Sequence, residues 1–486
     1  MIYYYIMYAC LKPERYVQAF SVSSLKEGFI VQTQIFTAHK RHLGMRAPTV
    51  LAVGFALTIL VGALVLMLPV SAADGQITPF LDALFTAASA SCVTGLVTVS
   101  TAVHWSVFGK CVILLLIQIG GLGFMSVAAI ASFVLRRTIT LHERMVMSAG
   151  LNLSDGGGIV RLTRRVLFGT FIIEGTGAVL LSCRFVPHYG FPKGITMGVF
   201  HAVSAFCNAG FDLMGTPDDP FQSLIGWAED PLVNITLMAL IVLGGLGFFV
   251  WSDVWDKHSF CRLRLHTKIV LTATAGLLLF GFGWTLLFEW NNPATLGAFD
   301  TPHKLLAAAF ESVTLRTAGF NTIDLGALTG PSQAVSCLLM FIGGSPGSTA
   351  GGIKTVTAAV LVLTAISAFC GRTTVSAFGR TIAPRSIMNA VTLLMAGGVL
   401  CLVGACAIAG IEDAPFHQCL FEAVSAFGTV GVSMGLTPTL SAASCVILIV
   451  MMYMGRVGVL TLGVAVFMRR REPPRLKYPD ADVFIG

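Results

Sequence analysis

The sequence predicts an all-α membrane protein built from four repeats, each a helix, a short re-entrant half-helix and a second helix. Composition gives the first reason: 55% of the 486 residues are hydrophobic and 11% are charged, against roughly 25% charged residues in soluble domains. The second reason is that eight apolar segments have the length of about 20 residues that crosses a bilayer. The third is that short apolar segments, similar to one another, follow every odd-numbered span.

The eight expected spans leave the basic residues mainly on one side of the membrane. These spans are residues 49–69, 107–135, 166–186, 232–251, 268–288, 332–370 (interrupted), 387–411 and 442–468. Most of the 31 Lys and Arg residues lie in the two tails and in the loops after even-numbered spans. By the positive-inside rule both termini are therefore cytoplasmic. The net charge of +7 follows from this topology and does not indicate nucleic-acid binding.

Residues 1–47 fit this plan poorly and are expected to form a cytoplasmic N-terminal tail. Two interpretations stay open: a small interfacial segment at Met1–Tyr8, or an over-long start with the true start nearer Met45. The 12 cysteines are scattered singly through apolar runs without a C-x-x-C pair. They are therefore interpreted as small buried hydrophobic residues, not as disulfides or metal ligands.

The short segments after the odd-numbered spans form a fourfold repeat. They read LFTAASASCVTG (84–95), VFHAVSAFCNAG (199–210), AFESVTLRTAG (309–319) and LFEAVSAFGTVG (420–431). Their final glycines are 115, 109 and 112 residues apart, and such self-similarity at a near-constant period marks a repeat architecture. Packing glycines in helical hairpins are the alternative, which four copies with shared flanks disfavour.

Each repeated segment divides into a half-helix, such as Ala83–Cys92, and a glycine-centred stretch, such as Val93–Thr98. Non-helical backbone at membrane depth must be buried in protein or line a water-filled cavity. Four such stretches meeting on one axis could replace the hydration shell of a cation with backbone carbonyls. The half-helices would point their partially negative ends at the centre, and glycine would leave that centre free of side chains. The predicted filter residues are Val93, Thr94, Gly95, Asn208, Ala209, Gly210, Thr317, Ala318, Gly319, Thr429, Val430 and Gly431.

These motifs resemble the ion-translocating subunit of the Trk/Ktr/HKT potassium transporter superfamily, of the KtrB type. The matching stretches are CVTGL (92–96), NAGFD (208–212), RTAGFNT (316–322), GTVG (428–431), GGSPGSTAGGIK (343–354) and GRVG (455–458), within residues 48–470. The resemblance implies a pseudo-fourfold pore, a homodimer, and a cytoplasmic RCK-type nucleotide-binding regulatory protein (KtrA/TrkA-like). Glycine at the first filter position, Gly95, implies a preference for K⁺ over Na⁺.

The resulting organisation is a tail, four repeats and a second tail. Its boundaries are 1–47 for the N-terminal tail, 48–137, 160–256, 266–372 and 385–470 for the four repeats, and 471–486 for the cytoplasmic C-terminal tail.

Three basic residues fall at membrane depth, namely Arg316, Lys354 and Arg456, where charges are rare and usually functional. The glycine-rich loop 343–354 must break span six, and Ile353 between Gly352 and Lys354 spoils a phosphate-binding motif. The resemblance implies that this loop and Arg456 form a gate below the filter. A passive kink and a packing arginine bonded to carbonyls are the alternatives. The implied gating residues are Gly343, Gly344, Ser345, Pro346, Gly347, Ser348, Thr349, Ala350, Gly351, Gly352, Lys354 and Arg456.

Behind the filter, Glu311 and Arg316 are expected to form a supporting pair, with Glu422 in the corresponding half-helix of repeat four. Glu174, in the middle of span three, should face protein or water.

The predicted function is K⁺ uptake across a bacterial plasma (inner) membrane, with Na⁺ as a candidate activator and no covalently bound cofactor. Inward movement of one positive charge gains about 2.3 kcal/mol per 100 mV of membrane potential. A proton- or Na⁺-coupled secondary cation symporter is the alternative. An enzyme is not expected, because the spans contain no converging catalytic set.

Overall fold

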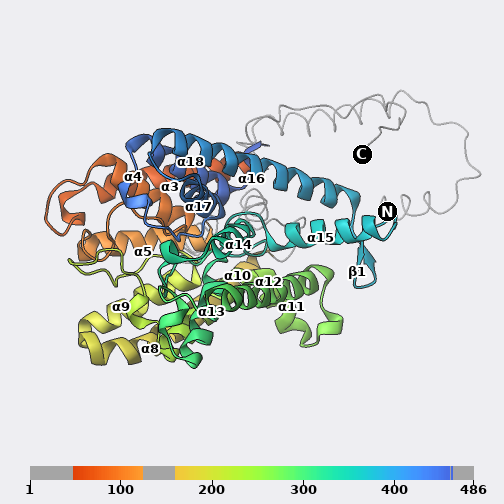
Figure 1. Cartoon of the computed structure of the whole chain (residues 1–486), viewed down its shortest axis with the longest axis horizontal. Coiled ribbons are helices and arrows are strands. Elements are labelled where there is room, and N and C mark those ends of the chain that lie inside the picture. The colour runs from red at the N-terminus through yellow and green to blue at the C-terminus, as the bar shows by residue number, and fades with distance from the viewer. Residues whose placement is uncertain (1–46, 124–158, 460, 464–486) are drawn as a thin grey trace, which may run out of the picture. The chain divides into compact units, whose positions relative to one another are not determined.

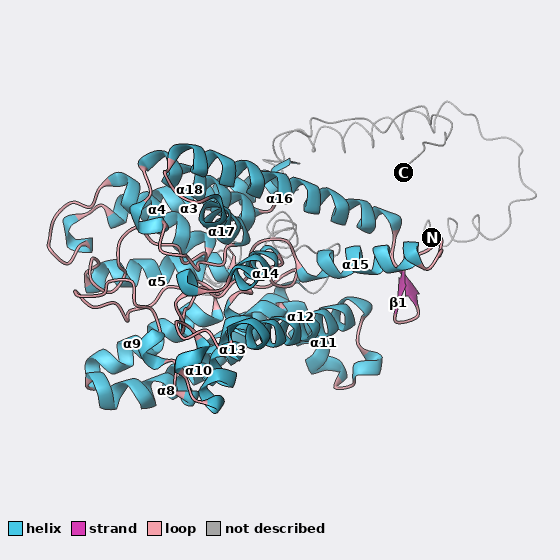
Figure 2. Ribbon diagram, in the orientation of Figure 1, coloured by secondary structure: helices cyan, strands magenta, loops and turns pink. Residues whose placement is uncertain are grey.

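The computed structural model describes residues 47–123, 159–459 and 461–463, and these are mostly helical (Figures 1 and 2). The expectations for residues 1–46 and for the C-terminal tail lie outside them. The helices are α3 (Ala47–Leu66), α4 (Phe80–Cys92), α5 (Val107–Leu122), α8 (Ile159–Tyr189), α9 (Phe191–Phe206), α10 (Pro231–Leu246), α11 (Phe248–Lys257), α12 (Leu265–Glu289), α13 (Thr301–Thr314), α14 (Gly330–Phe341), α15 (Thr355–Phe369), α16 (Pro384–Ile411), α17 (Phe416–Gly428) and α18 (Ala442–Val457). A small antiparallel hairpin between α15 and α16 consists of β1 (Ser376–Ala377) and β2 (Arg380–Thr381).

The described chain passes four times through a long helix, a short helix and a further helix. The short helices are α4, α9, α13 and α17, and each starts at a proline: Pro79 and Pro415 precede α4 and α17, and Pro192 and Pro302 lie in the first turns of α9 and α13. Proline suits this position because the first turn needs no backbone donor. The half-helix expected to end at Cys92 ends there.

The short helices and the helices that follow them are packed in cyclic order. α5 contacts α9, α10 contacts α13, α14 contacts α17, and α18 contacts α4. In each of these four pairs, the helix that follows the short helix of one unit contacts the short helix of the next unit. The four units therefore close into a ring within the described part of the chain.

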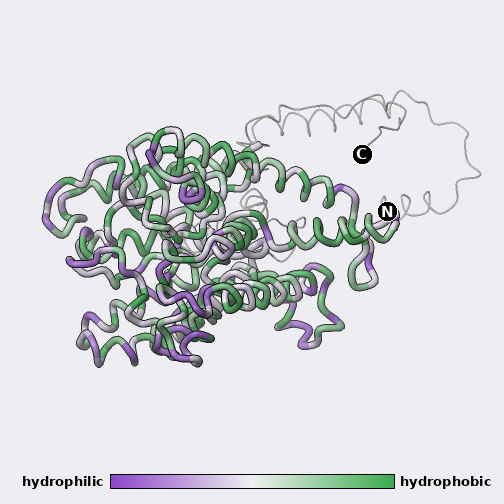
Figure 3. Tube along the Cα trace, viewed as in Figure 1, coloured by the Kyte–Doolittle hydropathy of each residue, from purple (hydrophilic) through white to green (hydrophobic). Residues whose placement is uncertain are grey.

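Four described helices are long and apolar enough to cross a membrane: Thr49–Leu66, Leu162–Tyr189, Leu265–Glu289 and Pro384–Ile411. The pair α10 and α11 counts as a fifth if it is one span bent by 91°. The expected spans 107–135 and 442–468 begin as α5 and α18, and residues 124–135, 460 and 464–468 lie outside the described residues. Figure 3 shows hydrophobic residues running along the long helices and hydrophilic residues gathered in the loops. Large apolar side chains such as Met395 and Val403 are exposed on α16, as expected where a helix faces lipid.

Two interruptions shape the region where the candidate site lies. Span six divides into α14 and α15, as expected, and residues 342–354 connect them without helix. The second interruption was not predicted: α10 and α11 meet at an angle of 91° at Gly247, whose φ of +92° favours glycine.

Candidate functional site

The four repeated glycines, named the ring glycines here, meet in the structure. Gly95, Gly210, Gly319 and Gly431 have φ of +99°, +69°, +85° and +94°, and each lies against the backbone of the next repeat in the cycle. A Cβ atom added to each glycine would crowd a carbonyl oxygen: Ala209 O at 2.6 Å from Gly95, Ala318 O at 2.9 Å from Gly210, Val430 O at 2.6 Å from Gly319, and Thr94 O beside Gly431. Four main-chain oxygens from four distant segments therefore gather at one place.

The residue two positions before each of these glycines has a strained backbone. Val93, Asn208, Thr317 and Thr429 have φ of +58°, +59°, +67° and +51°. Three of them are β-branched, a class for which a positive φ is a genuine outlier. Strain of this kind persists only when the surroundings enforce it, and it concentrates at functional sites. Ser223, His258 and Phe378 also have positive φ, but only this stretch shows it at the equivalent position of all four repeats within the described residues.

Side-chain hydroxyls hold the strained stretches from behind, and the sequence reasoning missed them. Ser425 Oγ accepts from Gly431 N (3.1 Å) and donates to Val432 O (2.7 Å). Equivalent bonds run from Gly95 N to Ser89 Oγ (3.0 Å), from Ser204 Oγ to Phe211 O (2.7 Å) and from Thr314 Oγ1 to Phe320 O (2.6 Å). The available signal was a hydroxyl six residues before the glycine in three repeats and five residues before it in the third.

A second missed feature is a glycine in each of α5, α10 and α18 that lets the helix touch the end of a short helix. A Cβ atom at Gly120, Gly244 or Gly455 would collide with a backbone oxygen, that of Ser91, Phe206 or Phe427 respectively. All three oxygens belong to residues four positions before the ring glycine. The signal was a recurring sequence, GGLG at 120–123 and 244–247 and GRVG at 455–458.

Arg456 follows the last of these glycines and reaches across to two other segments. Its guanidinium donates to Gly120 O on α5 and to Thr349 O in the loop 343–354, with Gly121 O at 3.4 Å. The corresponding positions of the other repeats are Gly121, Gly245 and Gly344. One long side chain therefore stands where three repeats have none.

The loop 343–354 contacts the strained stretches of the second and fourth repeats. Thr349 Oγ1 is 3.2 Å from Phe206 O and 3.3 Å from Asn208 Oδ1, and a Cβ atom at Gly351 would collide with Thr429 Oγ1. Backbone bonds hold the loop to the α10–α11 bend, from Ser345 N to Gly245 O (3.0 Å) and from Phe248 N to Gly347 O (2.9 Å). Within the loop, Lys354 Nζ donates to Ala350 O at 2.7 Å.

The three expected support residues have different surroundings. Glu422 accepts from Ser433 Oγ (2.6 Å), Met434 N (3.0 Å) and Thr437 Oγ1 (2.6 Å), and so holds the chain that leaves the fourth glycine. His201, nine residues before its glycine as Glu422 is, similarly accepts from Leu213 N at 3.3 Å. The sequence reasoning gave His201 no such role.

The expected pair of Glu311 and Arg316 does not form. Arg316 donates instead to Gly343 O (3.1 Å) and Thr355 Oγ1 (2.8 Å), and neither carboxylate oxygen of Glu311 has a hydrogen-bond partner among the described residues. The two residues are five positions apart, so they do not share a helix face, and Arg316 lies beyond the end of α13. The prediction of a pair was wrong, although Arg316 does reach the loop.

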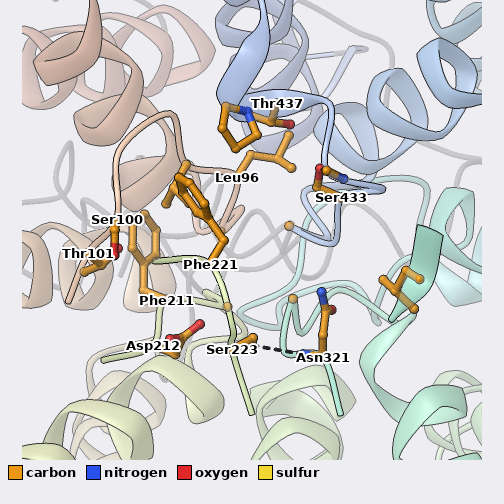
Figure 4. Close-up of a pocket in the computed structure, with 18 of the residues that line it drawn as sticks. Leu96, Ser100, Thr101, Phe211, Asp212, Phe221, Ser223, Asn321, Ser433 and Thr437 are labelled. Carbon is orange, nitrogen blue, oxygen red and sulfur yellow. Dashed lines mark hydrogen bonds between the residues drawn. The ribbon is translucent and has the colours of Figure 1, made fainter. Parts of the chain in front are cut away.

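A cavity of about 190 Å³ lies beside the four repeated glycines (Figure 4). All four glycines contribute to its lining. Asp212, Ser223, Asn321 and Ser433 give it a polar wall, and Asn321 N donates to Ser223 Oγ at 3.2 Å. A small hydrophilic ion could approach the ring through such a space.

The family model for a cation transport protein, TrkH, matches residues 27–472. The chain belongs to the TrkH family. It is 42% identical to the Ktr system potassium uptake protein B of Bacillus subtilis, over 90% of this chain and 96% of that protein. It is 40% identical to the potassium/sodium uptake protein NtpJ of Enterococcus hirae, over 90% and 96% of the two chains.

The fold of this TrkH-family chain also resembles that of a solved structure. The potassium transporter TrkH of Vibrio parahaemolyticus superposes with a TM-score of 0.68 at 17% identity, covering 88% of this chain and 86% of that one. The family consists of ion transporters, which confirms that the chain is not an enzyme. The described residues contain no group of three or more His, Cys, Asp or Glu side chains that could hold a metal ion.

Proposed function

We propose that this chain carries K⁺ into a bacterial cell through a pore on the axis of its four repeats. The observation that carries the proposal is the closed ring of glycines with the oxygens of Thr94, Ala209, Ala318 and Val430 beside it. Backbone carbonyls from several directions can replace the water around a dehydrating cation. The names of the relatives, potassium uptake protein B and potassium/sodium uptake protein NtpJ, support the same cargo.

In this proposal the repeats 48–137, 160–256, 266–372 and 385–470 form a pseudo-fourfold set of eight spans, with both termini in the cytoplasm. The twelve residues from Val93–Gly95, Asn208–Gly210, Thr317–Gly319 and Thr429–Gly431 are the filter. The cyclic packing of α5, α10, α14 and α18 on successive short helices supports this arrangement.

The loop 343–354 and Arg456 are the proposed gate. Arg456 ties α5, α18 and the loop together through backbone carbonyls, and a cation at this level would also oppose K⁺ electrostatically. We propose a homodimer and a cytoplasmic RCK-type nucleotide-binding protein as partners, and Na⁺ as an activator. Purification with the regulatory protein and flux measured with and without Na⁺ test these assignments.

The proposal is tested by flux of K⁺, Rb⁺ and Na⁺ into proteoliposomes with Gly95→Ser. Serine at φ of +99° is strained, and its Cβ would lie 2.6 Å from Ala209 O, so the ring must widen. We expect Na⁺ flux to rise relative to K⁺ flux. An unchanged ratio in the folded variant would remove Gly95 from the filter.

The same vesicles distinguish a pore from a coupled symporter. A pore carries K⁺ down its electrochemical gradient whatever the Na⁺ or proton gradient, whereas a symporter moves the two ions in a fixed ratio. Four repeats that close into one ring favour the pore, because coupled transporters place their site between paired repeats. A fixed Na⁺:K⁺ or H⁺:K⁺ stoichiometry would overturn the pore mechanism.

A further inference from the structure

Glu174 is a buried acid in the middle of α8 that the proposed function does not use. Its side chain is 5% exposed, and it faces protein, as expected. Gln118 Nε2 on α5 donates to both carboxylate oxygens, at 3.2 and 3.1 Å. The third member of the cluster is Cys207, at the end of α9, whose Sγ lies 3.8 Å from Glu174 Oε1 and 3.5 Å from Gln118 Oε1.

Cys207 lies between α9 and the strained backbone of the second repeat. It directly precedes Asn208, whose φ is +59°, so the placement of Cys207 sets where the strained backbone starts. On its other side α5 comes very close, since a Cβ atom at Gly121 would lie 2.6 Å from Cys207 Sγ. The thiol is thus enclosed between Gly121 and the Gln118–Glu174 pair and is fully buried.

The residue three positions before the ring glycine is also held in place in the third and fourth repeats, by hydrogen bonds or by close packing. In the third repeat it is Arg316, which is bonded to Gly343 O and Thr355 Oγ1. In the fourth it is Gly428, which packs so tightly that an added Cβ atom would lie 2.5 Å from Met340 O. In the first and second repeats it is a buried cysteine, Cys92 or Cys207. Only Cys207 has a printed contact with the Gln118–Glu174 pair among the described residues.

We propose that Glu174 is a positioning residue for the second filter strand, acting through Gln118 and Cys207 to set the ion selectivity of the pore. This inference rests on the proposed function. A buried cluster of polar side chains whose hydrogen bonds are all made keeps one conformation. Loss of one side chain leaves the remaining ones without a partner and able to move. Intramembrane ionisable residues are expensive to keep and usually functional, which agrees with a role for Glu174 beyond filling space.

The test compares K⁺ and Na⁺ flux into proteoliposomes for the full chain carrying Glu174→Leu, Gln118→Leu or both. Residues acting in one network show coupling that corresponds to roughly 2- to 150-fold effects, so we expect each single variant to lower the K⁺/Na⁺ ratio about fivefold. The double variant should be no worse than either single one. Glu174→Gln, which keeps an oxygen that can accept from Gln118, should stay within about twofold of the wild type.

Thr176→Leu is the matched control, because Thr176 lies on the same helix but is exposed, and its ratio should not change. A wild-type ratio in folded Glu174→Leu and Gln118→Leu overturns the inference, and so does a double variant whose effect is the product of the single effects. If Glu174→Leu does not fold, Cys207→Ala takes its place. A lower K⁺/Na⁺ flux ratio in that variant supports the inference, and a wild-type ratio overturns it. Wild type and Gly95→Ser are measured alongside: failure of K⁺ flux or of the Gly95→Ser shift rejects the proposed function, whereas success of both with no effect at Glu174 rejects this inference alone.

Discussion

At the scale of single residues, strain and its restraint occur together. Val93, Thr317 and Thr429 are β-branched residues at positive φ, a conformation that costs of order 1–3 kcal/mol each. A hydroxyl from the preceding helix bonds to the backbone just beyond each of them. These hydroxyls are the least conspicuous part of the site, because serine and threonine are common in membrane helices and usually bond within their own turn.

Ser425→Ala should weaken the fourth strand and lower selectivity. Ser425 Oγ accepts a hydrogen bond from Gly431 N and donates one to Val432 O, and each such bond is worth about 1 kcal/mol. We expect a lower melting temperature and a lower K⁺/Na⁺ flux ratio than in Ser376→Ala, a change at an exposed residue of the β1–β2 hairpin. A variant that loses stability but keeps its ratio would limit Ser425 to a structural role.

At the scale of elements, helices touch where a side chain is missing. Gly120, Gly244 and Gly455 bring α5, α10 and α18 onto the ends of three short helices. Arg456, next to Gly455, donates to the carbonyl oxygen of one of these glycines, Gly120, and to Thr349 O in the loop 343–354. The loop 343–354, the proposed gate, is hydrogen-bonded to α10, to α11 and, through Thr349, to Asn208 of the second repeat.

Gly244→Ala should destabilise the protein markedly. The added methyl group would collide with Phe206 O and lie 2.8 Å from Asn208 Oδ1, and overpacking of this kind costs about 1–3 kcal/mol. Gly276→Ala in α12 is the control, because nothing lies within 4 Å of its Cβ position. Alanine favours helix over glycine by up to about 1 kcal/mol, so the melting temperature of the control should stay the same or rise. Equal melting temperatures for both variants would contradict the close contact.

Arg456→Ala should raise K⁺ flux. The guanidinium holds α5 and the loop together, and hydrogen bonds from a charged group are worth about 1.5–3 kcal/mol, which corresponds to roughly tenfold or more in an equilibrium. We therefore expect Rb⁺ uptake to rise by about tenfold. Arg456→Lys keeps the positive charge but lacks the planar guanidinium group. Its Rb⁺ uptake should therefore lie between that of the wild type and that of Arg456→Ala. Uptake at or below the wild-type level in folded Arg456→Ala protein would count against a gate.

At the scale of the whole molecule, an ion at the ring would join all four repeats, so K⁺ should stabilise the complete fold. A ligand at 100 times its dissociation constant adds about 2.7 kcal/mol to the stability of the folded state. The melting temperature of detergent-solubilised protein should rise with K⁺ and Rb⁺, and less in Gly95→Ser. The same rise with choline at equal ionic strength would show a general salt effect and no site at the ring.

The sequence alone predicted the ring because its signal was repeated four times at nearly constant spacing. Contacts without repetition were not predictable in the same way. Thr349 and Asn208 are 141 residues apart, and no local pattern links them. Glu174 was recognised as unusual, but its partners on α5 and α9 depend on how three helices pack. The Glu311–Arg316 pair failed because closeness along the chain was taken for closeness in space.

Arg456 occupies the position that Gly121, Gly245 and Gly344 hold in the other three repeats. A channel assembled from four identical chains would carry four arginines at this position. The repulsion between their positive charges would keep the four side chains away from one another and from the centre of the channel. In the proposed pore the four repeats belong to one polypeptide, so a mutation can alter one side of the pore and leave the other three unchanged. In such a molecule a blocking side chain or a gating loop can be present in one repeat and absent from the other three.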